Sequence, residues 1–142
     1  MIEITKYNVN ADNSGLYELS GDNQKGIAIV YPSYTTVSEI RLLDTIITKA
    51  TGSDSMKDVL KIALKSGSKL NWFQIMNNYK ITNVLCFGIN PRTLSLNFEY
   101  RYNELIKFQN IEYIFSNNLN EIVEDQELKK TLWLCLKSSS LT

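Results

Sequence analysis

The apolar and polar residues of this chain follow a pattern that predicts strands separated by helices. A strand that is buried on both faces forms a short, nearly all-apolar run, and three such runs occur here. Turn-forming residues bound two of them, because Gly26 and Pro32 enclose the first and Gly88 lies at the end of the second. We therefore predict buried strands at 26–32, 84–89 and 111–115, with a further candidate strand at 16–19.

Helical spacing follows the first of these runs. Thr36 and Glu39 are separated by the spacing of a capping box, which marks the start of a helix. Apolar residues then recur every three or four positions up to Gly52, a typical helix stop, so that a helix is predicted over 37–51. The residues expected on its inward side are Ile40, Leu43, Ile47 and Ala50.

The remaining helical patterns are shorter. Asp125 is the expected N-cap of a last helix, whose buried side would carry Leu128, Leu132, Trp133 and Leu136. Two further segments are open, because 94–98 fits a short strand or an extended loop, and 102–108 fits a short helix or a turn. The other predicted helical segments are a second helix from about 55 to 67, a short third one over 72–79, one turn at 119–123 and the last helix over 126–137.

Alternation of strands and helices favours an α/β fold, in which helices flank a small, mostly parallel sheet in three layers. No internal repeat or linker interrupts the pattern, so we expect a single α/β domain over residues 1–142. The chain begins with a stretch of mostly polar side chains, and we interpret residues 1–15 as a flexible N-terminal arm.

Composition limits the chemistry that is open to this fold. Lys and Arg number 15, as do Asp and Glu, and this balance argues against a protein that grips phosphate backbones. We therefore expect no direct strong nucleic-acid binding. The chain has no histidine, which is the commonest general base and a common zinc ligand. We accordingly predict no metal site and no cofactor.

The two cysteines and the first residues bear on the cellular compartment. Cys86 and Cys135 are far apart in the sequence and each lies in an apolar stretch, so we expect both to be buried, reduced thiols. The start MIEITKYNVN lacks the cationic and apolar regions of a signal peptide, and no apolar run is long enough to span a membrane. These features predict a cytoplasmic protein without a membrane partner.

The turn at 88–91 raises the question of catalysis. Its sequence GINP resembles the first motif of the mismatch-specific uracil/thymine-DNA glycosylases, and that resemblance implies a catalytic role for Asn90 in holding the attacking water. Arg92 replaces the next glycine of the family motif. The segment 116–119, where the second motif of the family would lie, reads SNNL and lacks the proline of that motif. The other interpretation is that Asn90 is only a turn residue at a strand end.

Two longer stretches resemble another family. GIAIVYP at 26–32 resembles the first strand of the psi subunit of bacterial DNA polymerase III, and SNNLNEIVEDQELKKTLWLCL at 116–136 resembles the C-terminal pattern of psi. Psi is a clamp-loader accessory subunit with a uracil-DNA-glycosylase-like fold that lacks the catalytic groups. The resemblance implies a non-catalytic adaptor in DNA replication rather than an enzyme. Its implied partners are clamp-loader subunits and a chi-like subunit, which contacts single-stranded-DNA-binding protein.

Candidate partner-binding residues also follow from this resemblance. In psi an N-terminal arm docks on the clamp loader, which implies such a role for Ile2, Ile4 and Tyr7, although a first strand would also explain these residues. Trp133 matches the C-terminal psi pattern, but a tryptophan in an amphipathic helix fits a core position as well. Three hypotheses are open: a psi-like adaptor, a glycosylase that uses Asn90, and an α/β interaction domain with an unrelated partner.

Overall fold

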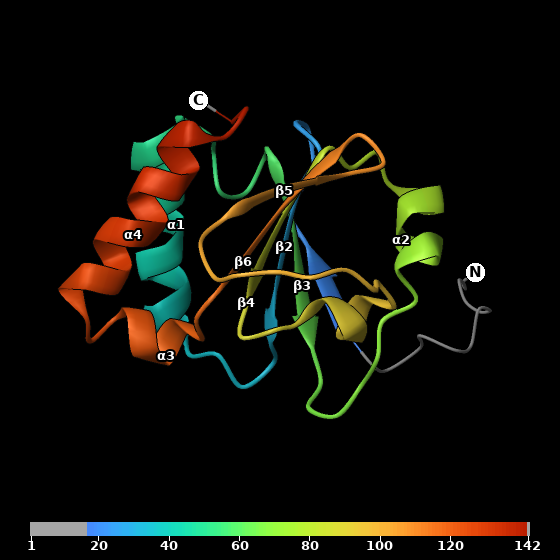
Figure 1. Cartoon of the computed structure of the whole chain (residues 1–142), viewed down its shortest axis with the longest axis horizontal. Coiled ribbons are helices and arrows are strands. Elements are labelled where there is room, and N and C mark those ends of the chain that lie inside the picture. The colour runs from blue at the N-terminus through green and yellow to red at the C-terminus, as the bar shows by residue number, and fades with distance from the viewer. Residues whose placement is uncertain (1–16, 142) are drawn as a thin grey trace.

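A six-stranded sheet lies at the centre of the computed structural model, which describes residues 17–141 (Figure 1). Its strands follow one another across the sheet in the order β1-β3-β2-β4-β6-β5. The three predicted buried strands are present as β2, β4 and β6, and the candidate strand near the start is present as β1. The bounds are β1 Tyr17–Ser20, β2 Ile27–Pro32, β3 Val59–Leu64, β4 Asn83–Phe87, β5 Leu105–Phe108 and β6 Ile111–Ser116.

The sheet is mixed, so the prediction of a mostly parallel sheet is wrong. The four central strands β3, β2, β4 and β6 run parallel to one another, whereas the edge strand β1 is antiparallel to β3 and the edge strand β5 is antiparallel to β6. Gln109 and Asn110 connect β5 to β6, with φ angles of 51° and 67° that are typical of a type I′ turn. A two-residue connection allows only antiparallel pairing, which explains the direction of β5.

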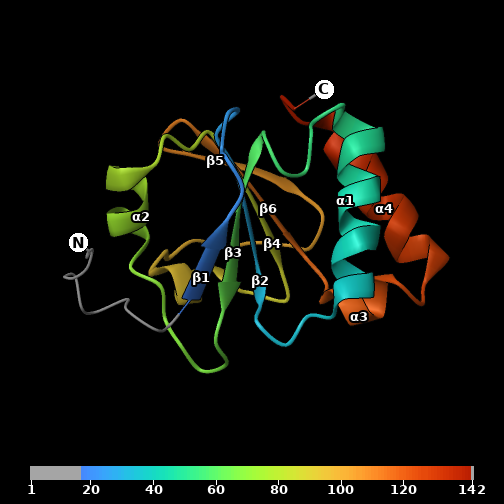
Figure 2. The same ribbon diagram turned by 180° about the vertical axis from the view of Figure 1, so that it is seen from behind.

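Helices cover both faces of the sheet, which confirms the α/β class. Figures 1 and 2 show α1 (Val37–Thr51), α3 (Leu119–Ile122) and α4 (Gln126–Ser138) on one face and α2 (Trp72–Asn78) on the other. Because side chains alternate along a strand, each face has its own core. In β2, for example, Ile27 and Ile29 pack toward α1, and Ala28 and Val30 pack toward the side of α2.

Helix α1 confirms the predicted bounds and caps. Thr36 Oγ1 accepts a hydrogen bond from Glu39 N at 3.2 Å, and Thr36 N donates to Glu39 Oε1 at 2.9 Å. Gly52 ends the helix with a φ of 75°, which lies in the left-handed region. The four residues expected on the inward side are buried or partly buried, namely Ile40, Leu43, Ile47 and Ala50.

The C-terminal helices also confirm the prediction. Asp125 caps α4, because its Oδ1 accepts hydrogen bonds from Glu127 N at 2.9 Å and from Leu128 N at 3.3 Å. The turn predicted at 119–123 is α3. The inward side of α4 is buried at Leu132 and Leu136 and partly buried at Leu128 and Trp133.

The prediction of a second helix over 55–67 is wrong, because this segment contains a turn that leads into strand β3. The carboxylate of Asp54 closes the turn by accepting two backbone hydrogen bonds. Lys61 interrupts the apolar run VLKIAL with a charge, and this mixture of apolar and polar residues resembles the pattern of an amphipathic helix. In the fold, however, Lys61 is buried, and its Nζ lies 2.8 Å from Asp44 Oδ1 and donates to Asp44 Oδ2 at 3.0 Å.

Two open segments are settled as well. Residues 102–108 contain strand β5 instead of a helix, so the helical alternative was wrong, because pairing with β6 rather than local propensity decides the structure. For 94–98 the strand alternative was wrong, since a 3-10 turn over Pro91–Leu94 leads into an irregular segment that packs Leu96 and Phe98 on the α2 side.

The predicted N-terminal arm lies outside the described residues. The same holds for the candidate partner residues Ile2, Ile4 and Tyr7, so their roles stay predictions. Both thiols, Cys86 and Cys135, are buried as expected. Among residues 17–141 no helix combines the length and the apolar character that crossing a bilayer requires.

The Lys61–Asp44 ion pair generates a stability prediction. Asp44→Asn should lower the free energy of unfolding by about 3 kcal/mol, because it leaves the Lys61 ammonium buried without a counter-charge. Replacing both partners by apolar residues, Lys61→Met with Asp44→Leu, should recover most of that loss. Urea unfolding at pH 7 measures both changes.

The control for this prediction is Glu104→Gln, which removes an exposed ion pair with Arg101 at 4.0 Å and should leave the unfolding midpoint unchanged. The prediction would be contradicted if Asp44→Asn and the double variant lost the same free energy of unfolding. The buried, unpaired charge of Lys61 would then not be destabilising.

Candidate functional site

The carboxyl ends of the parallel strands form the edge of the sheet where a ligand is expected. After β2 the chain crosses one face through α1 to reach β3, and after β3 it crosses the other face through α2 to reach β4 (Figures 1 and 2). The connections that lead to the two neighbours of β2, β3 and β4, therefore run over opposite faces of the sheet. The direction in which strands are added reverses at β2. Ligands of open α/β sheets bind outside the carboxyl ends of the strands at such a point.

Asn90 lies at this edge, just past the end of β4. Its Oδ1 accepts hydrogen bonds from Thr93 N at 3.2 Å and from Thr93 Oγ1 at 3.4 Å. Pro91 occupies the first position of the 3-10 turn that Asn90 caps, where a missing N–H is tolerated. The side-chain oxygen of Asn90 is thus used inside its own turn, whereas the side chain as a whole is exposed.

The segment at the end of β6 lies directly beside this turn. Gly88 N donates to Ser116 O at 3.1 Å, and Asn118 Nδ2 donates to Tyr34 Oη at 2.7 Å. Gly88 has a φ of 69°, and a Cβ placed there would lie 2.9 Å from Asn118 Nδ2. The fold therefore brings the segments 88–91 and 116–119 together, and Asn118 and Tyr34 bridge the loops after β6 and β2.

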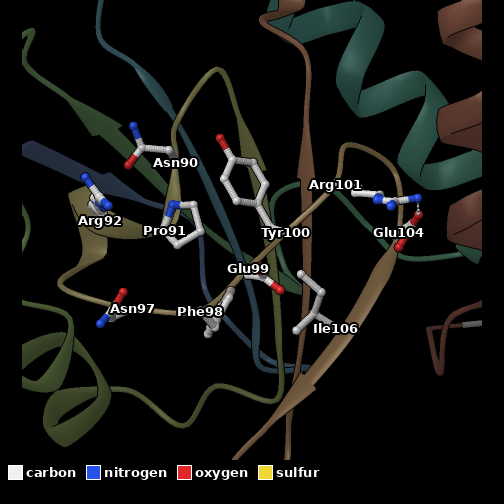
Figure 3. A pocket seen from close by; sticks show the side chains of 10 residues that line it. All are labelled: Asn90, Pro91, Arg92, Asn97, Phe98, Glu99, Tyr100, Arg101, Glu104 and Ile106. Carbon is white, nitrogen blue, oxygen red and sulfur yellow. Dashed lines mark ion pairs between the residues drawn. The ribbon is translucent and has the colours of Figure 1, made fainter.

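An open hollow of about 860 Å³ begins at Asn90 and extends along the segment before β5 (Figure 3). Figure 3 shows Tyr100 beside Asn90 and Ile106 at the far side of the hollow. Its floor and walls combine apolar rings with amide and charged groups. The lining residues are Asn90, Pro91, Arg92, Asn97, Phe98, Glu99, Tyr100, Arg101, Glu104 and Ile106.

Aromatic contacts hold one wall of the hollow in place. The ring centroid of Tyr100 lies 5.3 Å from that of Phe115, and the centroid of Phe98 lies 5.3 Å from that of Phe108 and 6.0 Å from that of Phe115. Tilted and edge-to-face arrangements at such distances are favourable. The β6 residue Phe115 therefore positions the irregular segment that carries Tyr100.

The titratable groups with shifted pKa values belong mostly to the core rather than to the hollow. Burial raises the pKa of the Cys86 thiol far above its ordinary value, and burial followed by the negative charge of Glu104 raises the pKa of Cys135 to about 11. Burial also raises the pKa of Tyr113, whose Oη accepts a hydrogen bond from Trp72 Nε1 at 3.2 Å. Within residues 17–141 no group of three or more His, Cys, Asp or Glu side chains could hold a metal ion.

The other candidate within the described residues, Trp133, lies on α4, which covers the face of the sheet opposite α2 (Figures 1 and 2). It is half-buried on α4 and packs against the core between the helices and the sheet, while part of its side chain is exposed. Trp133 does not line the hollow at Asn90. Its position is compatible with both the core and the partner-binding interpretation.

Sequence reasoning missed Tyr34 and Tyr100, and it included Asn118 only as part of the segment 116–119, without a role for its side chain. Tyr34 follows a buried strand, so the rule that loops after parallel strands form sites was the available signal. Tyr100 belongs to the aromatic-rich stretch 98–102, whose pattern is too irregular to predict a helix or strand.

Neither a family model nor a curated protein matches this chain.

The close approach at Gly88 generates a second prediction. Gly88→Ala should be more destabilising than Gly52→Ala by about 1 to 3 kcal/mol, because the new methyl group would press on Asn118. Both glycines have similar positive φ angles, but a Cβ at Gly52 meets nothing within 4 Å, which makes it a matched control for backbone strain. Thermal unfolding of both variants measures the difference, and equal losses would contradict the prediction.

The pKa of Cys135 generates a third prediction. In the Cys86→Ala background, iodoacetamide should alkylate Cys135 at pH 8 at least about 100-fold more slowly than a thiol with a pKa of 9.0. The rate should rise about tenfold per pH unit between pH 8 and 10, because only the thiolate reacts. The same protein in 8 M urea is the control, and a native rate close to the urea rate would contradict the prediction.

Proposed function

We propose that this chain is a non-catalytic adaptor subunit that resembles psi of bacterial DNA polymerase III. It would link the clamp loader to a chi-like subunit and, through it, to single-stranded-DNA-binding protein. The proposal includes a uracil-DNA-glycosylase-like fold without working catalytic groups. Support for that fold comes from the four parallel strands in the order β3-β2-β4-β6 and from the helices on both faces.

The observation that carries the proposal is the local use of the Asn90 side chain. In a glycosylase an asparagine at this position holds the attacking water, whereas Asn90 Oδ1 here accepts from Thr93 and caps a turn. Next to it, Asn118 and Tyr34 bond to each other across the strand ends. Polar groups that stabilise loops in this way favour a scaffold role over base chemistry.

A glycosylase that uses Asn90 is the second candidate. One observation favours it, because the segments 88–91 and 116–119 lie side by side at the edge of a sizeable hollow. Asn90 is exposed at the rim of this hollow and its Nδ2 group is not used in the turn. The experiment below therefore includes a test of base release.

The proposal is tested by titration calorimetry of the full chain into the clamp-loader complex of the same source. We expect a dissociation constant of about 1 µM or tighter, in the range of specific protein complexes. A variant with Ile2, Ile4 and Tyr7 replaced by serine should bind at least about 100-fold more weakly, because apolar anchors carry most of the energy of an arm that orders on binding.

The matched control carries serine at Asn8, Asn10 and Asn13 of the same segment and should bind like the unmodified chain. No binding at tens of micromolar would overturn the clamp-loader role. Release of a mismatched base that disappears in Asn90→Ala would then assign the glycosylase function. Failure of both assays would leave an interaction domain with an unrelated partner.

A further inference from the structure

We propose that the open edge of β5 and the hollow beside it form a docking site for an extended polypeptide segment of a partner protein. The segment would join the sheet as an additional strand and place alternate apolar side chains over the hollow. This inference rests on the proposed function, because it gives the adaptor a contact surface that is separate from the N-terminal segment. Its occupant is defined by four features of the described residues.

The first feature is a row of free main-chain groups. β5 is the last strand at its side of the sheet, and its two-residue turn makes Phe108 and Ile111 a hydrogen-bonded pair. Because hydrogen-bonded pairs alternate along antiparallel strands, the N–H and C=O groups of Ile106 also bond to β6, where Ile106 faces Tyr113. The N–H and C=O groups of Leu105 and Lys107 point away from the sheet, and in the described part of the chain no main-chain group bonds to them. A polypeptide strand is the ligand whose spacing matches such groups.

The second feature is the apolar side of the strand. Ile106 packs on the α2 side of the sheet and lines the hollow, and the ring of Phe108 contacts that of Phe98. Eight large apolar or aromatic side chains are exposed within residues 17–141. Three of them, Tyr100, Tyr102 and Phe108, lie between residues 100 and 108. Exposed apolar groups that gather beside an open strand edge mark a binding surface.

The third feature is the charge of the hollow. Arg92 and Arg101 are matched by Glu99 and Glu104, so the charged lining residues sum to zero. A phosphate backbone would meet two carboxylates here and gain little from the arginines. A polypeptide of low net charge meets no such penalty, and the chain itself also carries no net charge. The charge balance therefore favours a polypeptide over a nucleic acid.

The fourth feature is a set of free amide groups at the rim. Asn97 and the Nδ2 group of Asn90 have no hydrogen-bond partner within the described part of the chain. Side-chain amides donate to and accept from peptide groups equally well. They can bond to the main chain of a segment that continues past β5, because four residues of strand cover only about 13 Å.

The experiment selects the ligand from a phage library of random heptapeptides on the full chain and then measures the synthetic peptide by calorimetry. We expect selected peptides with apolar residues at alternate positions and a dissociation constant of about 1 to 100 µM. N-methylation of the alternate amides that face β5 should weaken binding at least about tenfold, because each methyl group removes a main-chain hydrogen bond to the strand. N-methylation of the other set should change binding less than threefold.

The protein-side variant is Lys107→Pro, with Lys107→Ala as its matched control. Proline at this position removes an N–H that points away from the β5–β6 ladder and is tolerated at edge strands. It should therefore weaken peptide binding about tenfold, whereas alanine should have little effect. The N-methylated peptides give the same information on the unmodified protein if the proline variant fails to fold.

Several outcomes would overturn the proposal. Strand addition would be excluded if the selected peptides lacked apolar residues at alternate positions. It would also be excluded if N-methylation of either set of amides weakened binding equally. Micromolar binding of a dT15 oligonucleotide that Tyr100→Ser abolishes would assign the hollow to nucleic acid. A dimer in sedimentation equilibrium that Lys107→Pro dissociates would assign the edge to a second copy of the chain.

The clamp-loader titration and the peptide measurement can fail independently. If peptides bind and the clamp loader does not, the docking site at β5 stands and the psi-like adaptor function is excluded. If the clamp loader binds and no peptide is selected, the docking site at β5 is excluded and the adaptor function stands.

Discussion

Complete burial of β2 is the constraint on which the rest of the fold depends. Its residues Ile27, Ala28, Ile29 and Val30 are all 0% exposed, and the strand pairs along both edges, with β3 and with β4. A strand that is apolar on both sides needs cover on both faces, so the chain must cross the sheet once through α1 and once through α2. The reversal of strand order at β2, and hence the location of the candidate site, follows from this requirement.

At that site the loops are held by polar groups that bond to one another. Asn90 bonds within its turn, Asn118 bonds to Tyr34, and Ser116 Oγ donates to Asn103 Oδ1 at 2.7 Å. Such bonds fix the positions of the loops relative to one another. The neighbouring aromatic segment adds exposed apolar area at Tyr100 and Tyr102, which is the kind of area that the proposed adaptor role would require.

Local patterns predicted those elements that local forces decide. The capping box of α1, the N-cap of α4 and the apolar runs of β2, β4 and β6 can all be read within a few residues. Strand β3 could not be predicted, because the charge of Lys61 is neutralised by Asp44, 17 positions earlier in the chain. The candidate site was predictable only around Asn90, since the bond from Asn118 to Tyr34 joins residues 84 positions apart.

The central position of β2 also has a consequence for synthesis of the chain. Residues 17–64 contain β1, β2, α1 and β3, and they can assemble one side of the sheet as they leave the ribosome. The other edge of β2 stays without its partner until β4 at Asn83–Phe87 has been made. During that interval the nascent chain exposes an apolar strand edge of the kind that aggregates, so we expect cotranslational folding to be sensitive to any pause that occurs before β4 has left the ribosome.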